Sequence, residues 1–222
     1  MNVLGFDTAT AASSACVLRD DGEAFESEPD PGRLTTPPAH ARELMPAVAA
    51  VLERSGLRWS ELDAVAVGVG PGTFTGLRIG VSTARALAHA HHLQLYPVSS
   101  LSALAAGIDA PLRLPLIDAK RGEVFAALYE GAEEVWAPLA ATPEALVERL
   151  RQAGATPLGV GDGSIRFRGV LEAAGIRVAP DGANAHVVRA LNVCHLAGQV
   201  RPAPVDAVLP DYLRLPDATP SS

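Results

Sequence analysis

The sequence has almost no lysine: Lys120 is the only one among its 222 residues. The arginines are scattered along the chain, and the formal net charge is −7 at pH 7. A protein that binds tRNA or DNA by itself normally presents a basic face, because phosphate neutralisation supplies most of the affinity. Direct and strong nucleic-acid binding by the isolated chain is therefore not expected, while a contribution inside a larger complex stays open.

Long apolar runs and a basic leader are also missing. Proline, glycine or a charged residue interrupts every candidate before it reaches the roughly 18 residues that a membrane span needs. The chain opens on an apolar segment, residues 3–6, without the positive region that begins a secretory signal. We therefore expect no membrane association and a location in the cytoplasm.

Cysteine is too scarce for a disulfide framework. Cys16 and Cys194 are the only two, and each lies in an apolar stretch. Two buried free thiols in a reducing compartment are expected rather than a disulfide. The GxSxG turn of acyl hydrolases is absent as well, so the sequence offers no serine nucleophile of that kind.

The most informative segment that is present, residues 68–85, reads GVGPGTFTGLRIGVSTAR. It follows an apolar run, residues 64–69, and opens into a helical pattern. Gly70, Gly72 and Gly76 allow backbone angles or close approaches that a side chain would forbid. The segment is therefore either a sharp strand-to-helix connection or a turn that holds a ligand close to the backbone.

The helix that follows this turn has a start suited to anions. Thr73 and Thr75 are placed to cap its free N–H groups, and those groups together with the helix dipole favour negative charge. The candidate phosphate or nucleotide loop comprises Asp7, Thr8, Gly70, Gly72, Thr73, Gly76 and Arg78.

The order of the predicted elements is that of an α/β protein. In the first half, strands are predicted at residues 3–6, 15–18, 23–28, 64–69 and 94–98, and helices at 39–55, 76–91 and 99–106. In the second half, strands are predicted at 114–118, 125–129, 135–137 and 157–160, and helices at 143–153, 164–174 and 185–199.

The second half repeats the first. Asp7 aligns with Asp118, an offset of 118 − 7 = 111 residues, and the same offset superposes the strands that follow each aspartate. A duplicated unit predicts two lobes with a cleft between them, residues 1–108 and a smaller lobe, 109–222, with a proline-punctuated tail. The alternative is that two unrelated hairpins each happen to carry an aspartate.

Five segments occur in one order across residues 6–214: FDTAT, HARELMP, GPGTFTGLRIGVSTARALA, IDAKRGEVF and PDYLR. This set resembles the TsaB family, also called YeaZ. The resemblance implies a duplicated actin-like (ribonuclease H-like) α/β fold, with a mixed sheet flanked by helices in each lobe. It also implies a non-catalytic partner of TsaD in forming threonylcarbamoyladenosine, the modified base next to the anticodon of tRNAs that read codons beginning with A.

Several partners follow from the resemblance. The chain is expected to form a heterodimer with TsaD, to join TsaE in a larger complex, to pair with itself when alone, and to meet tRNA only through the complex. The expected partner surface lies on helices 39–55 and 76–91. Small residues recur every four positions in the second of these helices, and the alternative is that this stripe packs on the protein's own sheet. The expected interface residues are His40, Leu44, Val48, Gly80, Val81, Ala84, Arg85 and Ala88.

Catalysis by the isolated chain is not expected. TsaD carries a metal-binding segment of the form VNHLEGH, and the matching residues 98–104 read VSSLSAL, which places Ser100 and Leu104 at the histidine positions. The turn after Asp7 has no glycine to close around a phosphate. We therefore predict no catalytic residue, no metal and no cofactor, and leave weak nucleotide binding open.

Two other functions remain as alternatives: a stand-alone ATP-dependent threonylcarbamoyltransferase, and a glycoprotease-like peptidase. A metal site could use the cluster of His89, His91 and His92, with His40 as the only obvious further ligand. Histidines at a helix C-terminus are more simply explained by their interaction with the helix dipole.

Overall fold

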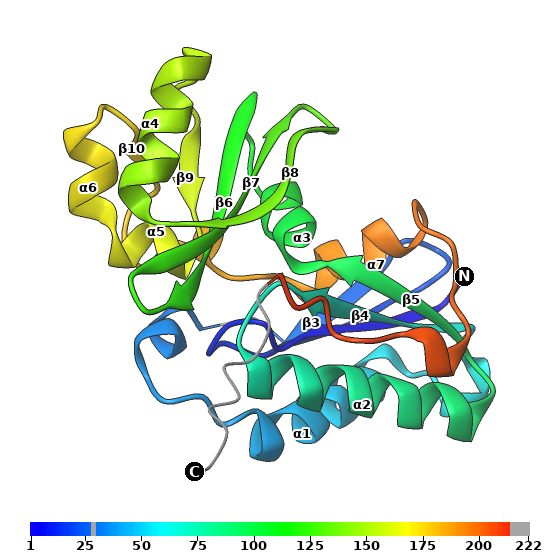
Figure 1. Ribbon diagram of the computed structural model, residues 1–222. Helices are drawn as coiled ribbons and strands as arrows, with labels where there is room; N and C mark the ends of the chain where they lie inside the picture. The colour runs from blue at the N-terminus through cyan, green and yellow to red at the C-terminus, as the bar shows by residue number, and fades with distance from the viewer. Residues whose placement is uncertain (28–29, 214–222) are drawn as a thin grey trace, which may run out of the picture.

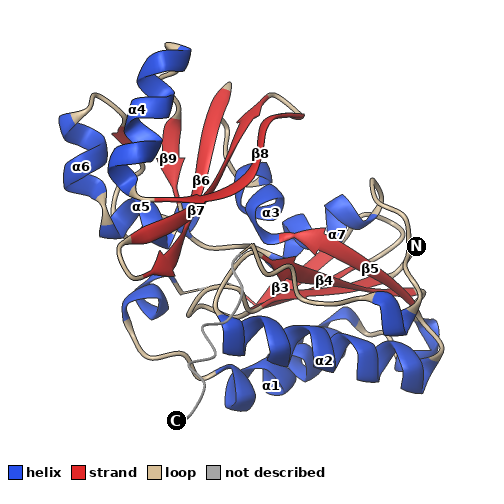
Figure 2. Ribbon diagram, viewed as in Figure 1, coloured by secondary structure: helices blue, strands red, loops and turns tan. Residues whose placement is uncertain are grey.

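The computed structural model, described over residues 1–27 and 30–213, has two lobes, each built on a five-stranded sheet (Figures 1 and 2). Residue 28, predicted as the end of the third strand, and the tail from residue 214 lie outside the described residues. The first sheet has the order β3-β2-β1-β4-β5. Its strands are β1 (Val3–Asp7), β2 (Ser14–Leu18), β3 (Ala24–Ser27), β4 (Ala64–Gly70) and β5 (Gln94–Ser99).

Helices cover both faces of this sheet. The helices around it are α1 (His40–Ser55), α2 (Phe74–His91), α3 (Ser100–Ala106) and α7 (Ala190–Ala197). Figure 1 shows α1 and α2 along one side of the sheet and α3 and α7 on the other. In β1, Leu4 and Phe6 pack with the first pair of helices, while Val3 packs with α7. The central strand is therefore buried throughout, which explains why it reads as a continuous apolar run.

The second sheet repeats the first. Its strands are β6 (Leu112–Lys120), β7 (Glu123–Glu130), β8 (Glu133–Ala141), β9 (Leu158–Val160) and β10 (Arg177–Val178), in the order β10-β9-β6-β7-β8. In each sheet the first three strands along the chain pair antiparallel in sequence, the fourth pairs in parallel with the first, and the fifth pairs in parallel with the fourth. The predicted duplication and the actin-like α/β fold class are confirmed.

The second lobe carries its helices mainly on one face. These are α4 (Pro143–Ala153), α5 (Asp162–Arg166) and α6 (Arg168–Ala173). Leu146 and Leu150 of α4 pack with Leu171 of α6 against β6 and β7. Short 3-10 helices span Pro31–Thr35, Trp59–Glu61, Asn184–His186 and Val205–Ala207.

Two predicted helices are wrong in extent. The helix predicted at 164–174 is interrupted at Phe167, whose φ of −109° is not helical, so α5 and α6 are separate. The helix predicted at 185–199 begins only at Ala190, because residues 187–189 are extended and the Ser14 hydroxyl donates to the Val188 carbonyl at 2.8 Å. Strand β10 was not predicted, since its two residues are too short to show a pattern.

Each sheet is partly covered by a helix from the other half of the sequence. Helix α7 belongs to the second half of the sequence, yet it contacts β1 and β2, and α3 from the first half contacts β6. Cys194 of α7 lies against the backbone of β1 and β2, its Sγ 3.6 Å from the Cys16 carbonyl oxygen. Both cysteines are buried and free, as predicted. The division at residues 108 and 109 stays a prediction.

Glu26 in β3 holds the start of α7 in place. Its Oε1 accepts the Leu191 N–H at 2.9 Å, and its Oε2 accepts the Arg189 Nε–H at 3.0 Å. The Glu26 side chain is 7% exposed and that of Arg189 is 37% exposed. Hydrogen bonds to charged groups each contribute about 1.5–3 kcal/mol when one partner is buried.

We therefore expect Glu26→Leu to lower the free energy of unfolding by roughly 2–3 kcal/mol, because it removes both contacts. Glu26→Gln keeps one acceptor for Leu191 and should lose about half as much. Urea denaturation followed by circular dichroism measures both. Equal stabilities of Glu26→Leu and the wild type would contradict this account of how α7 is anchored.

No helix among the described residues is both long enough and apolar enough to cross a membrane.

Candidate functional site

A cavity of about 890 Å³ opens between the two lobes. The first lobe contributes the start of α1 and the glycine-rich turn before α2, and the second contributes the β6–β7 hairpin. Its lining residues include His40, Arg42, Gly72, Thr73, Phe74, Gly76, Asp118, Lys120, Arg121, Phe125, Asp211 and Tyr212. With Asp211 and Tyr212, four segments far apart in the sequence therefore meet at one place.

Asp7 lies beneath this cavity rather than in it. It is fully buried, its Oδ1 accepts the Ala9 N–H at 2.7 Å, and its Oδ2 accepts the Ser100 hydroxyl at 2.6 Å. Ser100 Oγ in turn accepts the Gly70 N–H at 3.2 Å. Burial raises the pKa of Asp7 to about 6 despite these hydrogen bonds. Asp7 thus links β1, β4 and α3, and its oxygens are already occupied.

Thr8 fills the space that the glycines of α2 leave. Its hydroxyl donates to the Gly76 carbonyl at 2.8 Å, and a β-carbon on Gly80 would collide with the same hydroxyl. A β-carbon on Gly72 would meet Ala9 at 2.6 Å. Much of the glycine-rich segment therefore serves close packing against the β1–β2 turn, and Gly72, Thr73 and Gly76 are its cavity-facing part.

The start of α2 is uncapped. Thr73 is the N-cap residue, but its hydroxyl is buried without a hydrogen-bond partner, so the predicted capping by Thr73 is wrong. Thr75 lies inside the first turn and does not cap it either. The backbone N–H groups of residues 74–76 donate to none of the residues that the structure describes. Arg78 lies outside this lining, with its guanidinium 4.7 Å above the Phe74 ring.

His40 begins α1 and faces the same turn of α2. Its Nδ1 is 2.7 Å from Ser13 Oγ, whereas its Nε2 is buried and has no hydrogen-bond partner among the described residues. That Nε2 lies 3.2 Å from the point where a β-carbon on Gly76 would be. Burial lowers the pKa of His40 below its usual value, so the ring is neutral at pH 7.

The second hairpin presents a charged cluster. Asp118 Oδ1 accepts the Lys120 N–H at 2.9 Å and so satisfies a backbone donor of the turn. Its Oδ2 pairs with Lys120 Nζ at 2.8 Å and Arg166 Nη1 at 2.9 Å. Burial pushes the pKa of Asp118 upward, but the hydrogen bonds and charge of Lys120, with the charge of Arg166, hold it below its usual value. Asp162 lies behind it, and burial raises the pKa of that carboxyl to about 6.

The expected partner stripe is buried inside this chain. Ala84 and Ala88 pack in the core against the first sheet, as the alternative has it, and Gly80 lies against Thr8 of the β1–β2 turn. The residues of the expected surface that are buried are His40, Leu44, Val48, Gly80, Val81, Ala84 and Ala88. Arg85 is partly exposed and pairs with Asp206 at 3.1 Å. The side chains that these two helices do expose include Met45 and Phe74, 44% and 41% exposed.

The histidines do not form the cluster that a metal would need. His91 stacks on Trp59 with ring centroids 4.5 Å apart, at the C-terminal end of α2. His40 faces the N-terminal end of that 18-residue helix, roughly 20 Å away at 1.5 Å per residue. Ser100 is engaged with Asp7, and Leu104 packs in the core. Over residues 1–27 and 30–213, no three His, Cys, Asp or Glu side chains are placed to hold a metal ion.

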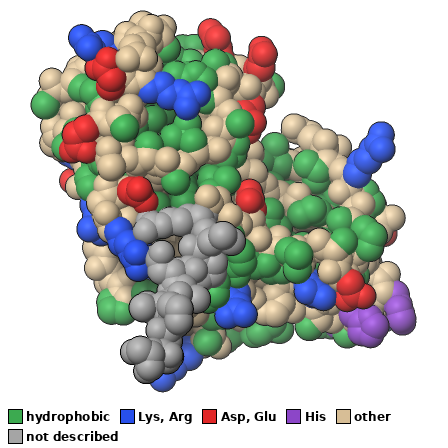
Figure 3. Space-filling view, viewed as in Figure 1, with side chains coloured by type: hydrophobic (Ala, Val, Ile, Leu, Met, Phe, Trp, Pro, Cys, Tyr) green, Lys and Arg blue, Asp and Glu red, His purple; other side chains and the backbone are tan. Residues whose placement is uncertain are grey.

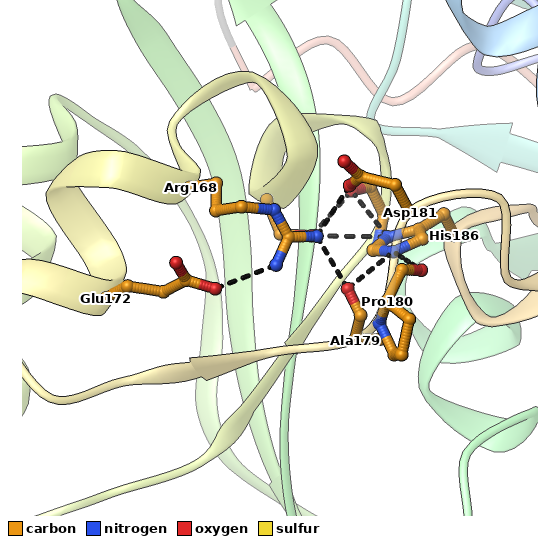
Figure 4. A network of polar contacts seen from close by, with 8 residues as sticks. Arg168, Glu172, Ala179, Pro180, Asp181 and His186 are labelled. Atoms are coloured by element: carbon orange, nitrogen blue, oxygen red, sulfur yellow. Dashed lines mark hydrogen bonds and ion pairs between the residues drawn. The ribbon is translucent and has the colours of Figure 1, made fainter.

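A buried histidine that the sequence did not single out, His186, organises the second lobe (Figure 4). Its Nδ1 is 3.3 Å from Ser164 Oγ, but both side chains are fully buried and Ser164 donates to the Gly161 carbonyl at 2.7 Å. Figure 4 shows Arg168 contacting Glu172, the Ala179 carbonyl and Asp181 beside this histidine. The Ser164–His186 pair therefore has a structural role, because water and substrate cannot reach the serine.

Known proteins resemble the chain over most of its length. A family model described as TsaD, tRNA N6-adenosine threonylcarbamoyltransferase, matches residues 35–156. The tRNA threonylcarbamoyladenosine biosynthesis protein TsaB of Escherichia coli is 34% identical over 172 residues, which cover 73% of this chain and 72% of that protein. An uncharacterised protein of Mycobacterium leprae is 39% identical over 142 residues, or 64% of this chain, and the match spans only 39% of its length.

A solved structure has the same fold. It is a Pseudomonas aeruginosa protein described as uncharacterised with similarity to peptidase YEAZ. The two superpose with a TM-score of 0.79 at 29% sequence identity, over 96% of this chain and 99% of the other.

Proposed function

Because the chain belongs to the TsaB (YeaZ) family, we propose that it is a non-catalytic subunit that binds TsaD in the formation of threonylcarbamoyladenosine in tRNA. The observation that carries the proposal is the match to the Escherichia coli protein, whose name places that relative in this biosynthesis. The complex would act in the cytoplasm, with TsaE as a further component.

The residues at the transferase positions support a non-catalytic role. Ser100 and Leu104 stand where TsaD carries histidines, and the Ser100 hydroxyl donates to Asp7 while Leu104 is buried. The serine and histidine of the second lobe are closed to solvent, which argues against a peptidase. Group transfer would need a metal ion, or several hydrogen-bond donors that converge on one point, to stabilise the charge that develops in the transition state.

Surface charge supports contact with tRNA only through the complex. On the face in Figure 3, lysine and arginine side chains form separate patches between hydrophobic and acidic ones rather than one continuous basic field. The net charge of −7 has the same implication.

The proposed partner surface is the exposed face of the paired helices α1 and α2, which contact each other (Figure 1). Met45 on α1 and Phe74 at the start of α2 are exposed large apolar side chains. Ala86 is an exposed small residue of α2, located between Phe74 and the C-terminal end of that helix. Covering such a face removes apolar area from water, and a second copy of the chain would cover it when TsaD is absent.

A reconstituted reaction tests the proposal. We expect threonylcarbamoyladenosine to form on tRNA when the chain is added to TsaD, TsaE, ATP and the carbamoyl-adenylate donor, and not when the chain is left out. The chain alone should neither transfer the group nor hydrolyse ATP with steady turnover. Nucleoside analysis by mass spectrometry and a phosphate-release assay measure the two activities.

Two outcomes would overturn it. Full modification by TsaD and TsaE without this chain would remove the need for a scaffold. Modification or steady ATP turnover by the chain alone would favour the stand-alone transferase, and cleavage of a peptide would favour the peptidase.

A further inference from the structure

We propose that Cys16 and Cys194 form a modification site, at which a hydroperoxide converts the two thiols into a disulfide that fastens α7 to the first sheet. This inference does not depend on TsaD binding. The two residues lie 178 positions apart and are the only cysteines of the chain, so an intramolecular disulfide can join no other pair.

The register of β2 points Cys16 toward α7. In the antiparallel pairing of β1 with β2, Cys16 lies opposite Gly5. Successive side chains of a strand point to opposite faces of the sheet. Ala15 and Val17 accordingly pack on the side of α1, whereas Cys16 packs in the same buried cluster as Cys194.

Gly5 lets α7 come close to the strand beside Cys16. A β-carbon on Gly5 would collide with the Cys194 sulfur, and it would lie 3.1 Å from the Ala190 carbonyl oxygen and 3.4 Å from the Cys194 nitrogen. Residues opposite each other in such a pair have β-carbons about 4.5–5.5 Å apart. The Cys194 sulfur therefore occupies the space above Gly5, next to the Cys16 side chain.

A second contact places the same sulfur over β2. Cys194 Sγ lies 3.6 Å from the Cys16 carbonyl oxygen and 3.8 Å from that of Val3. A disulfide needs its two Cα atoms about 4.4–6.8 Å apart, which demands a close approach of the two backbones. The missing side chain at Gly5 provides that approach, so a disulfide here would hold α7 in the position it already has.

Both thiols are protected while α7 is seated. Cys16 is 0% exposed and Cys194 is 2% exposed. Burial, with a further contribution from the neighbouring Cys16, raises the pKa of the Cys194 thiol, and only the thiolate is a good nucleophile. Oxidation therefore requires α7 to lift locally from the sheet. This helix has eight residues, and Glu26 holds its start through Arg189 and the Leu191 N–H.

The reaction consumes one hydroperoxide. While α7 is lifted, one thiolate attacks the peroxide, the O–O bond breaks, and a sulfenic acid and an alcohol (water, when the reagent is hydrogen peroxide) are formed. When α7 returns, the second sulfur attacks the sulfenic sulfur, the S–S bond forms and water leaves. The two sulfurs lose two electrons to the peroxide, and the two thiol protons end in the alcohol and the water.

Hydrogen peroxide added to the folded full-length chain tests the site. We expect both thiols to be lost together, the mass to fall by two hydrogen atoms, and the peptides that contain Cys16 and Cys194 to be joined until dithiothreitol is added. Because the bond closes a loop of about 180 residues, the oxidised chain should melt roughly 5–10 °C higher than the reduced one. Cys194→Ala should form no intramolecular disulfide and show no such rise.

Glu26→Gln tests the role of α7. It weakens the hold on the start of the helix, so the disulfide should form about five- to tenfold faster at the same peroxide concentration. Glu53→Gln is the matched control, since Glu53 is an exposed residue of α1, and it should react at the wild-type rate.

Four results would overturn the proposal. They are thiols that both stay free in the folded chain under peroxide that oxidises the urea-unfolded chain, a disulfide that joins two chains instead, an oxidised chain that melts below the reduced one, and equal rates for Glu26→Gln and the wild type.

Discussion

Ala84→Arg is expected to abolish folding. Ala86→Arg, two residues further along the same helix, is expected to fold normally but no longer to bind TsaD. Ala84 is fully buried against the first sheet, so an arginine there would place an unpaired charge in the core. Such a change costs more than about 4 kcal/mol, a large part of the stability of a typical domain. Ala86 is exposed, so an arginine there changes only the proposed partner face.

Circular dichroism melts measure folding, and size-exclusion chromatography with TsaD measures binding. Ala132→Arg, at an exposed position in the β7–β8 turn, controls for the added charge and should keep both properties. If the free chain pairs through the same face, Ala86→Arg should also be monomeric in sedimentation experiments. Unchanged co-elution of Ala86→Arg with TsaD would refute the surface, and a stable Ala84→Arg protein would refute the packing.

Asp7→Asn is expected to stabilise the protein at pH 7 by up to about 3 kcal/mol, and the gain should vanish near pH 4. Burial raises the pKa of Asp7 from 3.8 in the reference state to about 6 in the folded protein. Between those values the folded state holds more protons than the unfolded state, so the wild type loses stability as pH rises through that window. A shift of about two pKa units corresponds to about 3 kcal/mol.

The comparison must be made as a difference between variant and wild type at each pH. His40, whose pKa burial lowers, has the opposite effect: its contribution is lost as pH falls below its usual value of 6.5. Urea denaturation at pH 4, 5, 6 and 7 gives the difference directly. Asp162→Asn is an independent case with the same sign, because burial raises that pKa to about 6 as well. If the free energy of unfolding of Asp7→Asn differed from that of the wild type by the same amount at all four pH values, the raised pKa of Asp7 would be contradicted.

The sequence was sufficient for the elements with strong periodicity and for the duplication. Helix α4 matches its predicted bounds, because Pro143 begins it and Gly154 ends it in the left-handed conformation. The offset that aligned Asp7 with Asp118 held because each aspartate bonds the turn that follows its strand. Short or interrupted elements such as β10 and the break at Phe167 depend on tertiary contacts that a local pattern does not contain.

The direction of the small-residue stripe could not be read from its spacing. Gly80 is small because Thr8, seventy-two residues earlier in the chain, occupies the space of its side chain. A stripe that receives a partner helix has the same composition as one that receives the protein's own turn. Likewise, the glycine-rich turn predicted a ligand site near Gly72 and Gly76, but Tyr212 enters the cavity from a distant segment with no motif of its own.

The position of α7 has a consequence for synthesis on the ribosome. Residues 1–108 are made well before residues 190–197, yet those late residues cover the face of the first sheet that includes Val3, Cys16 and Ala66. Helix α3, made earlier, contacts β4 and β5, so until α7 emerges it is the part of this apolar face over β1 and β2 that has no permanent cover. The lobe that is translated first is therefore the one that is completed last, and a polypeptide terminated early would leave it open to water and to other nascent chains.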